Sequence, residues 1–199
     1  METVRPARQG GCVRGLFRDT GGPERDRASG ADVRLDGDPG ACLRGRRKRG
    51  QTSQALGRSR GGFGTKIHLK TDHDGLPVAF ELTGGEAADS PMFEALIDAG
   101  PDEPARAVIG DKGYDSDANR ALARERGAVP VIPHRSNRKA IPARFAKALY
   151  RGRARIEQMM GKLKRFKRVA LRCEKTARNF RSIVALAATF ILLKSVHTA

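Results

Sequence analysis

Hydrophobic and polar positions take up a regular pattern only from about residue 61 onward. Two stretches with apolar residues flank His73-Asp74-Gly75, and Asp-Gly is a strong hairpin signal, so this region predicts two antiparallel strands. Short apolar runs at 105–109 and 128–132 follow. They have the length of buried strands, and the first ends at Gly110-Asp111.

Helical signals lie between and after these runs. Ser90 is expected to cap a short helix with Pro91 at its first position, and Ser116 is expected to cap a second helix that Gly127 ends. A long basic helix and a last apolar helix, at about 176–194, complete the pattern. Strands that alternate with helices predict an α/β fold with a mixed sheet and flanking helices.

Residues 1–50 show neither a helical nor a strand period. The segment is rich in Gly, Arg and Asp, and it cannot bury enough apolar surface to offset the entropy lost on ordering. We therefore expect a disordered arm over 1–50, followed by one folded domain over 51–199.

The charge of the chain is concentrated in one segment. Lys and Arg number 39 against 22 Asp and Glu, a net charge of +17. Residues 135–181 hold 17 Lys or Arg and two acids, a net +15. An ordinary solvated surface mixes both signs, so this segment predicts contact with a polyanion. A nucleic acid is the favoured partner, and a ribosomal or chromatin-like role stays open at this point.

Cysteine usage and the two termini indicate a cytoplasmic protein. Cys12, Cys42 and Cys173 form no close pair, which argues against a zinc site or a disulfide framework. The N-terminal residues lack the apolar core of a signal peptide. The longest apolar run, 183–193, is too short to cross a bilayer, so no membrane partner is expected.

Two acids stand out as candidate chemical groups. Asp111 directly follows a predicted buried strand, and ligands of open α/β sheets collect at the carboxyl ends of strands. A turn aspartate that caps the following residues is the alternative. Glu157 is the single acid in the basic stretch 150–172, and Tyr150, Arg153, Glu157 and Lys164 fall close to one helical stripe. An ordinary ion pair between Arg153 and Glu157 is the alternative there. Asp115 and Asp117 are expected to cap the next helix.

The spacing Tyr150-x2-Arg153-x3-Glu157-x6-Lys164 resembles the signature of DDE transposases of bacterial insertion sequences, the insertion sequence four and five groups. The segments "GRSRGGFGTKIHLKTDHDGLPVAFELTGGEAADS", "VIGDKGYDSD", "VIPHRSNRKAIP" and "RFKRVALRCEKTARNF" also look like successive blocks of that family. The resemblance runs in order over residues 51–193.

The resemblance implies an RNase H-like fold and metal-dependent DNA strand cleavage and transfer at the ends of a mobile element. Asp111 would be the second catalytic aspartate and Glu157 the catalytic glutamate, and both would hold Mg²⁺ or Mn²⁺. DNA contacts are expected from the signature helix and the basic residues after it: Tyr150, Arg153, Lys164, Arg165, Lys167 and Arg168. Double-stranded DNA is the expected partner, bound by a homo-oligomer, with the protein at the bacterial nucleoid while it is bound.

The chain departs from the family at the first catalytic aspartate. The family carries it at the end of an N-terminal strand, in a block that resembles Asp-Ser-Thr, whereas Asp36 and Asp38 lie in a segment without an apolar strand. Dropping the first base of one permitted back-translation of residues 32–50 restores a string that resembles this block. We therefore interpret residues 1–49 as an out-of-frame segment and expect the first core strand to be missing. The chain is then an incomplete transposase, expected to bind DNA without cutting it. The alternative is a non-catalytic DNA-binding relic or a second-frame product of a transposase gene.

Overall fold

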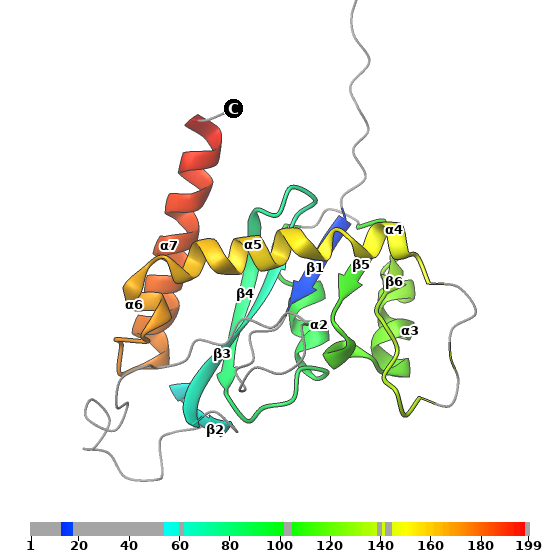
Figure 1. Ribbon diagram of the computed structural model, residues 1–199, viewed down its shortest axis with the longest axis horizontal. Helices are drawn as coiled ribbons and strands as arrows, with labels where there is room; N and C mark the ends of the chain where they lie inside the picture. The colour runs from blue at the N-terminus through cyan, green and yellow to red at the C-terminus, as the bar shows by residue number, and fades with distance from the viewer. Residues whose placement is uncertain are drawn as a thin grey trace, which may run out of the picture.

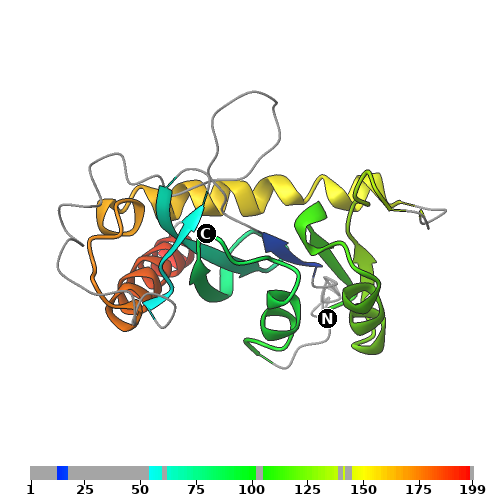
Figure 2. The ribbon, with the colours of Figure 1, turned by 90° about the horizontal axis from the view of Figure 1, so that it is seen from below.

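The computed structural model describes residues 54–59, 62–101, 105–138, 141 and 145–197, together with the backbone of Val13–Phe17. These residues form a mixed sheet with helices on both faces (Figures 1 and 2). The strands are β1 (Val13–Phe17), β2 (Gly57–Ser59), β3 (Gly62–Thr71), β4 (Pro77–Gly84), β5 (Ala107–Gly110) and β6 (Val129–Val131). The helices are α2 (Met92–Ile97), the 3-10 turn η2 (Lys112–Tyr114), α3 (Asp117–Glu125), α4 (Lys147–Tyr150), α5 (Arg153–Lys164), α6 (Lys167–Ala170) and α7 (Ala177–His197). The predicted α/β class is confirmed.

The sheet combines antiparallel and parallel pairs. β4 pairs with β3, β3 with β1, β1 with β5, and β5 with β6, while β2 pairs with the first residues of β3. The β3–β4 and β1–β3 pairs are antiparallel, and the β1–β5 and β5–β6 pairs are parallel. Because β1, β5 and β6 run in the same direction, their carboxyl ends meet at one edge of the sheet.

Strand β1 corrects the expectation that the first core strand is missing. Leu16 lies opposite Lys70 of β3 on one side and opposite Gly110 of β5 on the other. Backbone pairing with β1 satisfies N–H and C=O groups of β3 and β5 that would otherwise lack hydrogen-bond partners. Backbone pairing does not require particular side chains in β1. A weak strand pattern in "VRGLF" therefore sufficed. The rest of residues 1–50, including Asp36 and Asp38, lies outside the described residues.

The predicted hairpin is confirmed as β3–β4. Gly75 has φ 82°, a left-handed conformation that favours glycine, and the Leu76 amide donates to Asp72 Oδ1 at 2.8 Å. A Cβ on Gly75 would lie 2.9 Å from Cβ of Arg155. The turn between the strands thus packs directly against helix α5.

Strand β3 is buried on both faces. Ile67 and Leu69 pack with α5, α6 and α7 in one core cluster. The alternating polar residues Lys66, His68 and Lys70 are also buried. Figure 2 shows why: α5 covers one face of the sheet, and α2 and α3 cover the other. A strand pattern that looked half polar is a core strand in which Lys66, His68 and Lys70 all have hydrogen-bond partners.

Those partners are mostly on the α2 side of the sheet. Lys70 Nζ donates to the carbonyls of Ile97 and Ala99 at 2.7 and 2.6 Å, at the end of α2. His68 Nδ1 lies 3.0 Å from the Tyr114 hydroxyl, and its Nε2 lies 2.8 Å from Thr83 Oγ1. Both ring nitrogens of His68 therefore have hydrogen-bond partners, as buried polar groups generally do. His68 is a packed strand residue.

Helix boundaries differ from the sequence pattern in two places. Ser116 caps α3 as predicted, since its Oγ accepts from the Asn119 amide at 3.0 Å. Ser90 does not cap α2: Pro91 is the N-cap, and Ser90 instead accepts from the Asn119 side chain. The long basic helix is broken into α4, α5 and α6.

Helix α7 is the last predicted helix, extended to 21 residues. Among the described helices it alone is long and apolar enough to cross a membrane, by length and composition only. The expectation that the apolar run is too short rested on its 11 unbroken residues. Phe180, Val184 and Ala187 of α7 are buried in the core cluster with α5 and β3, whereas Leu186, Phe190, Leu193 and Val196 are exposed.

Candidate active site

Asp111 follows the carboxyl end of β5, as the sequence predicts. Its backbone is extended, and its Oδ1 accepts from the Lys112 amide at 2.5 Å, so it caps the η2 turn. The capping alternative is thus correct in geometry. Asp111 is nevertheless partly exposed, and among the described residues its Oδ2 has no hydrogen-bond partner.

Glu157 lies on α5, in the middle of the helix that crosses the sheet (Figure 1). Its Oε1 is 2.8 Å from Arg153 Nη2, so the ion-pair alternative is also correct in geometry. The buried residues Ile156, Met159, Met160 and Leu163 hold α5 on the sheet. Glu157 falls beside that buried stripe, which leaves its side chain 37% exposed.

Tyr150 joins the two acids. Its ring lies against Phe145, with centroids 5.2 Å apart, and the Arg153 guanidinium lies 5.7 Å from the ring centroid. Burial raises the pKa of the Tyr150 hydroxyl; the charge of Arg153 lowers it, and the negative charges of Asp111 and Glu157 raise it. Asp111 and Glu157 thus both contribute to the raised pKa of this hydroxyl.

The other predicted DNA contacts lie away from Glu157. Lys164 ends α5, seven residues and about 10 Å beyond Glu157 along the helix axis. Arg165 and Lys167 are exposed around the start of α6. Arg168 is exposed as well, and its Nε donates to Glu174 Oε1 at 3.0 Å. These cations form a basic end of α5 and α6, separate from the acids.

Comparison with known proteins decides the family. A family model described as "Transposase DDE domain" matches residues 40–192, more than three quarters of the chain. The chain belongs to this transposase family. No solved structure matches it.

Two relatives of this DDE family are named as transposases of insertion sequences. The chain is 37% identical over 131 residues to one from Brucella ovis, named for insertion sequence element IS6501, which covers 65% of the chain and 98% of that protein. It is 33% identical over 123 residues to one from Burkholderia cepacia, named for element IS402. That match covers 57% of the chain and 56% of the relative.

DDE transposases use divalent metal ions, so the carboxylate oxygens of Asp111 and Glu157 are of interest as possible metal ligands. Asp111 and Glu157 each have one oxygen engaged, Oδ1 with Lys112 and Oε1 with Arg153. Among the described residues the second oxygen of each acid has no partner, and carboxylate oxygens are what Mg²⁺ prefers. The described part of the chain holds no cluster of three or more His, Cys, Asp or Glu around a common point. Each acid therefore offers a carboxylate oxygen of the kind that Mg²⁺ prefers, but the described residues supply no group of three ligands.

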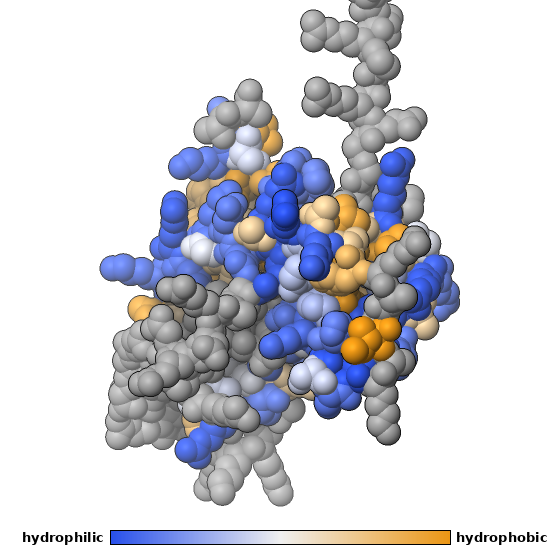
Figure 3. Space-filling model, turned by 45° about the vertical axis from the view of Figure 1, so that its right-hand side comes forward, coloured by the Kyte–Doolittle hydropathy of each residue, from blue (hydrophilic) through white to orange (hydrophobic). Residues whose placement is uncertain are grey.

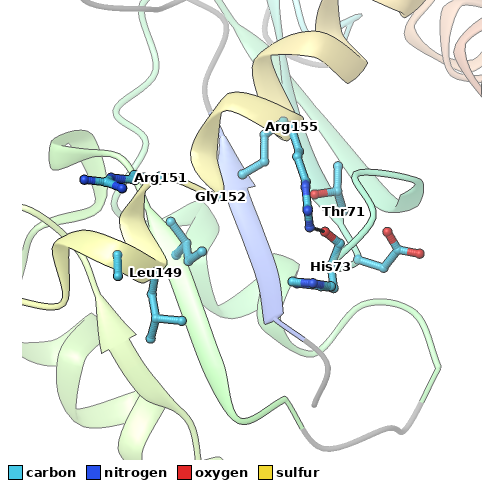
Figure 4. Close-up of a pocket in the computed structure, with 10 residues that line it drawn as sticks. Thr71, His73, Leu149, Arg151, Gly152 and Arg155 are labelled. Atoms are coloured by element: carbon cyan, nitrogen blue, oxygen red, sulfur yellow. Dashed lines mark hydrogen bonds between the residues drawn. The ribbon is translucent and has the colours of Figure 1, made fainter. Parts of the chain in front are cut away.

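A cavity of about 300 Å³ lies beside this site, under the junction of α4 and α5. Ile109, Gly152 and Ile156 line it, with Arg155 on the side of the β3–β4 turn. In Figure 4 the Arg155 side chain extends from α5 to His73, and Arg155 Nη1 donates to the His73 carbonyl. Asp111 and Glu157 are not among the described lining residues.

The expectation that Asp115 caps α3 is wrong. Asp115 is instead the centre of a buried group of ion pairs, which the sequence did not predict. Its side chain is 1% exposed and lies 2.9 Å from both Arg120 Nη2 and Arg138 Nη1. It also accepts from the Arg135 amide at 2.8 Å. Burial works against the charged carboxylate, but these three partners outweigh it and lower the pKa of Asp115 below the ordinary value of 3.8. The only sequence signal was the excess of arginines in the loop that follows β6.

The outer surface near α3, α4 and β6 is mostly polar (Figure 3). Exposed large apolar residues in this part of the chain are Val129, Ile141 and Leu149. A group of apolar residues lies among the polar ones on the right-hand side of this face (Figure 3).

Proposed function

We propose that the chain is an insertion-sequence transposase domain that binds duplex DNA and uses Asp111 and Glu157 as ligands of a divalent metal. The observations that support it are the position of Asp111 directly after β5, and the Arg153 guanidinium, which pairs with Glu157 and lies over the Tyr150 ring. The insertion-sequence relatives support the same function.

The fold proposed for this domain is RNase H-like. Its support is the sheet order β4-β3-β1-β5-β6, with β3 antiparallel to β1 and with β5 and β6 parallel to it. Asp111 follows β5, and Glu157 lies on the helix that covers the same sheet. An RNase H-like site would need these two carboxylates, from distant parts of the chain, to lie close together.

Each residue has a role in the proposed reaction. When bound, Mg²⁺ or Mn²⁺ polarises the scissile phosphate and activates the attacking hydroxyl. Asp111 and Glu157 would hold the ion through the oxygens that face away from Lys112 and Arg153. Tyr150 and Arg153 would contact the DNA phosphates next to the metal. Lys164, Arg165, Lys167 and Arg168 would bind the DNA backbone farther along the duplex.

The third carboxylate is the missing part of this site. The family match begins at residue 40, so strand β1 beside β5 comes from outside the matched region. Asp19 stands two positions after the last residue of β1 in the sequence, and it is a candidate for this carboxylate together with Asp36 and Asp38; all three lie outside the described residues. We propose that the chain as written binds DNA but does not cut it, because in-line displacement needs ligands for both the attacking and the leaving oxygen.

Partners and location follow from the reaction. An insertion sequence has two ends, and each must meet an active site, so we propose a homo-oligomer on DNA. We propose a cytoplasmic protein at the nucleoid, without a membrane partner; the burial of one face of α7 supports this. The alternative is a non-catalytic relic or second-frame product of a transposase gene.

Duplex binding and nicking by the purified full chain test these proposals. We expect salt-sensitive binding in fluorescence anisotropy and no nicking of supercoiled plasmid with Mg²⁺ or Mn²⁺. Failure to bind duplex DNA at low salt would reject the function. Metal-dependent nicking that Glu157→Gln abolishes would reject the incomplete site. In that case Asp19→Asn, Asp36→Asn and Asp38→Asn would identify the third ligand.

A further inference from the structure

The turn that carries Asp111 is held from outside by a single arginine. Arg135 lies in the loop after β6, and its guanidinium donates twice to the η2 turn. Nε reaches the Lys112 carbonyl at 3.1 Å, and Nη2 reaches the Gly113 carbonyl at 2.7 Å. These are the first two carbonyls after Asp111.

The loop that supplies Arg135 is itself fixed. The Arg135 amide donates to Asp115 Oδ2, and Arg120 Nη2 donates to the Ile132 carbonyl at 2.5 Å. Arg138 adds a bond to Asp115 Oδ1 at 2.9 Å. The buried Asp115 carboxylate thus joins the loop after β6 to the start of α3, and Arg135 extends from this junction to the η2 turn.

The far side of the turn has no room to shift. A Cβ on Gly113 would lie 2.6 Å from Asp89 Oδ2, so Asp89 packs directly on its Cα. Asp89 in turn pairs with Lys66 Nζ at 3.4 Å. The Tyr114 ring is fully buried, with its hydroxyl 3.0 Å from His68 Nδ1. The turn is therefore held between Asp89 and Tyr114 on the inside and Arg135 on the outside.

We infer that Arg135 is a positioning residue that sets the orientation of the Asp111 carboxylate through the Lys112 and Gly113 carbonyls. This inference rests on the proposed role of Asp111 as a metal ligand. A planar guanidinium with two donors can fix two neighbouring carbonyls, whereas an ammonium group acts as a single point charge. Residues that orient a metal ligand typically change metal affinity by about tenfold or more when they are replaced.

The positive charge of Arg135 opposes metal binding, whereas its hydrogen bonds to the η2 turn favour metal binding. The two effects can therefore be told apart by experiment. Arg135 is a cation close to the ligand, so removing its charge alone would favour a bound metal ion. Loss of position would weaken metal binding instead. Arg135→Ala and Arg135→Lys are therefore both expected to weaken Mn²⁺ binding about tenfold, while Arg126→Ala, an exposed cation paired with Asp98, leaves it unchanged.

The experiment measures Mn²⁺ affinity of the full chain by electron paramagnetic resonance, with Asp111→Asn as reference. If Asp111→Asn does not weaken Mn²⁺ binding, the proposed metal role of Asp111 fails. If it does, but both Arg135 variants bind Mn²⁺ as tightly as the parent chain, the positioning inference fails while the proposed function stands.

Hydrogen exchange without metal gives a second, independent measurement. The amides of Tyr114 and Asp115 donate to the Asp111 and Lys112 carbonyls, at 3.0 and 3.2 Å. Both should exchange faster in Arg135→Ala and Arg135→Lys, with the α3 amides and the melting temperature unchanged. Unchanged exchange at Tyr114 and Asp115 would overturn the inference whatever the metal result.

Discussion

The Nη2 nitrogen of Arg153 lies 2.8 Å from the Oε1 oxygen of Glu157, one turn further along α5. A pair of this kind on a partly exposed helix contributes only a few tenths of a kcal/mol, about 0.3–0.5. Its effect is therefore on orientation rather than stability. It engages one oxygen of the Glu157 carboxylate.

Glu157→Gln should abolish Mn²⁺ binding while leaving the fold and DNA binding intact. The amide keeps the shape of the side chain but loses the charge that a divalent cation needs. Removing an acid from a basic helix does not weaken its attraction for phosphates. Mn²⁺ titration, thermal melting and anisotropy with duplex DNA measure the three effects.

Glu174→Gln is the matched control for this prediction. Glu174 is also an acid of the basic segment, but it pairs with Arg168 at the turn before α7. It should keep Mn²⁺ affinity. Equal loss of Mn²⁺ in both variants would show that the ion responds to overall charge and not to a site at Glu157.

Lys164→Ala and Arg165→Ala should each weaken duplex binding and reduce its salt dependence. A residue that neutralises one phosphate contributes about 0.9 to the slope of log affinity against log salt. Arg168→Ala should have a smaller effect, because its guanidinium is already paired with Glu174. Anisotropy over a salt series measures the slopes.

The control for the DNA prediction is Arg126→Ala. This cation is exposed at the end of α3, on the opposite face of the sheet from α5, and pairs with Asp98. It should leave the slope unchanged. An equal loss of slope at Arg126 and Lys164 would mean that DNA binds without a preferred face.

The sequence predicted those features that depend on neighbouring residues. The Asp-Gly turn of the β3–β4 hairpin needs only local backbone geometry, and so does the Ser116 cap of α3. Asp111 could be placed at the end of β5 for the same reason. The stripe of Tyr150, Arg153 and Glu157 depends on helical spacing alone, and the Arg153–Glu157 pair follows from it.

Features that depend on distant residues were not predictable in this way. Strand β1 forms because β3 and β5 offer backbone partners on both sides, although its own pattern is weak. The burial of Lys66 and Lys70 requires partners in and after the β4–α2 turn. The role of Asp115 requires Arg120, Arg135 and Arg138, up to 23 residues away in the chain. We expect the Asp111 and Glu157 carboxylates to lie within about 8 Å of each other, as ligands of one metal pair, and this stays a prediction.

Arg172→Ala should destabilise the domain without touching the site. Arg172 is buried, and its guanidinium donates to the Gln54 and Ala55 carbonyls at 2.6 and 3.2 Å and stacks 4.9 Å from the Phe180 ring centroid. Burial lowers its pKa to about 10. Removing it takes the Arg172 donor from the Gln54 carbonyl, whereas the Ala55 carbonyl still accepts from Thr65 Oγ1. We expect the lost hydrogen bonds to cost about 2 kcal/mol.

Urea unfolding at pH 7 measures this cost, and Arg172→Lys separates packing from hydrogen bonding. A lysine keeps a charge but cannot serve both carbonyls, so we expect it to recover only part of the loss. Mn²⁺ affinity should not change in either variant. A fully stable Arg172→Ala variant would show that the contact between the α6–α7 turn and residues 54 and 55 is dispensable.

The last prediction concerns the pH dependence of stability through Asp115. Because its pKa is lowered in the folded state, its contribution to stability is present above the unfolded value, near 3.8, and is lost as pH falls through the folded value. Asp115→Asn should destabilise the domain by about 3 kcal/mol at pH 7, since Arg120 is left buried without its counter-charge. The gap between parent and variant should shrink as pH falls below 3.8, because the parent then loses the same charge. Urea unfolding at pH 7, 5 and 3 measures the gap, with the exposed Asp98→Asn as control. A gap that stays constant down to pH 3 would show that the shape of the side chain, and not its charge, joins the loop after β6 to α3.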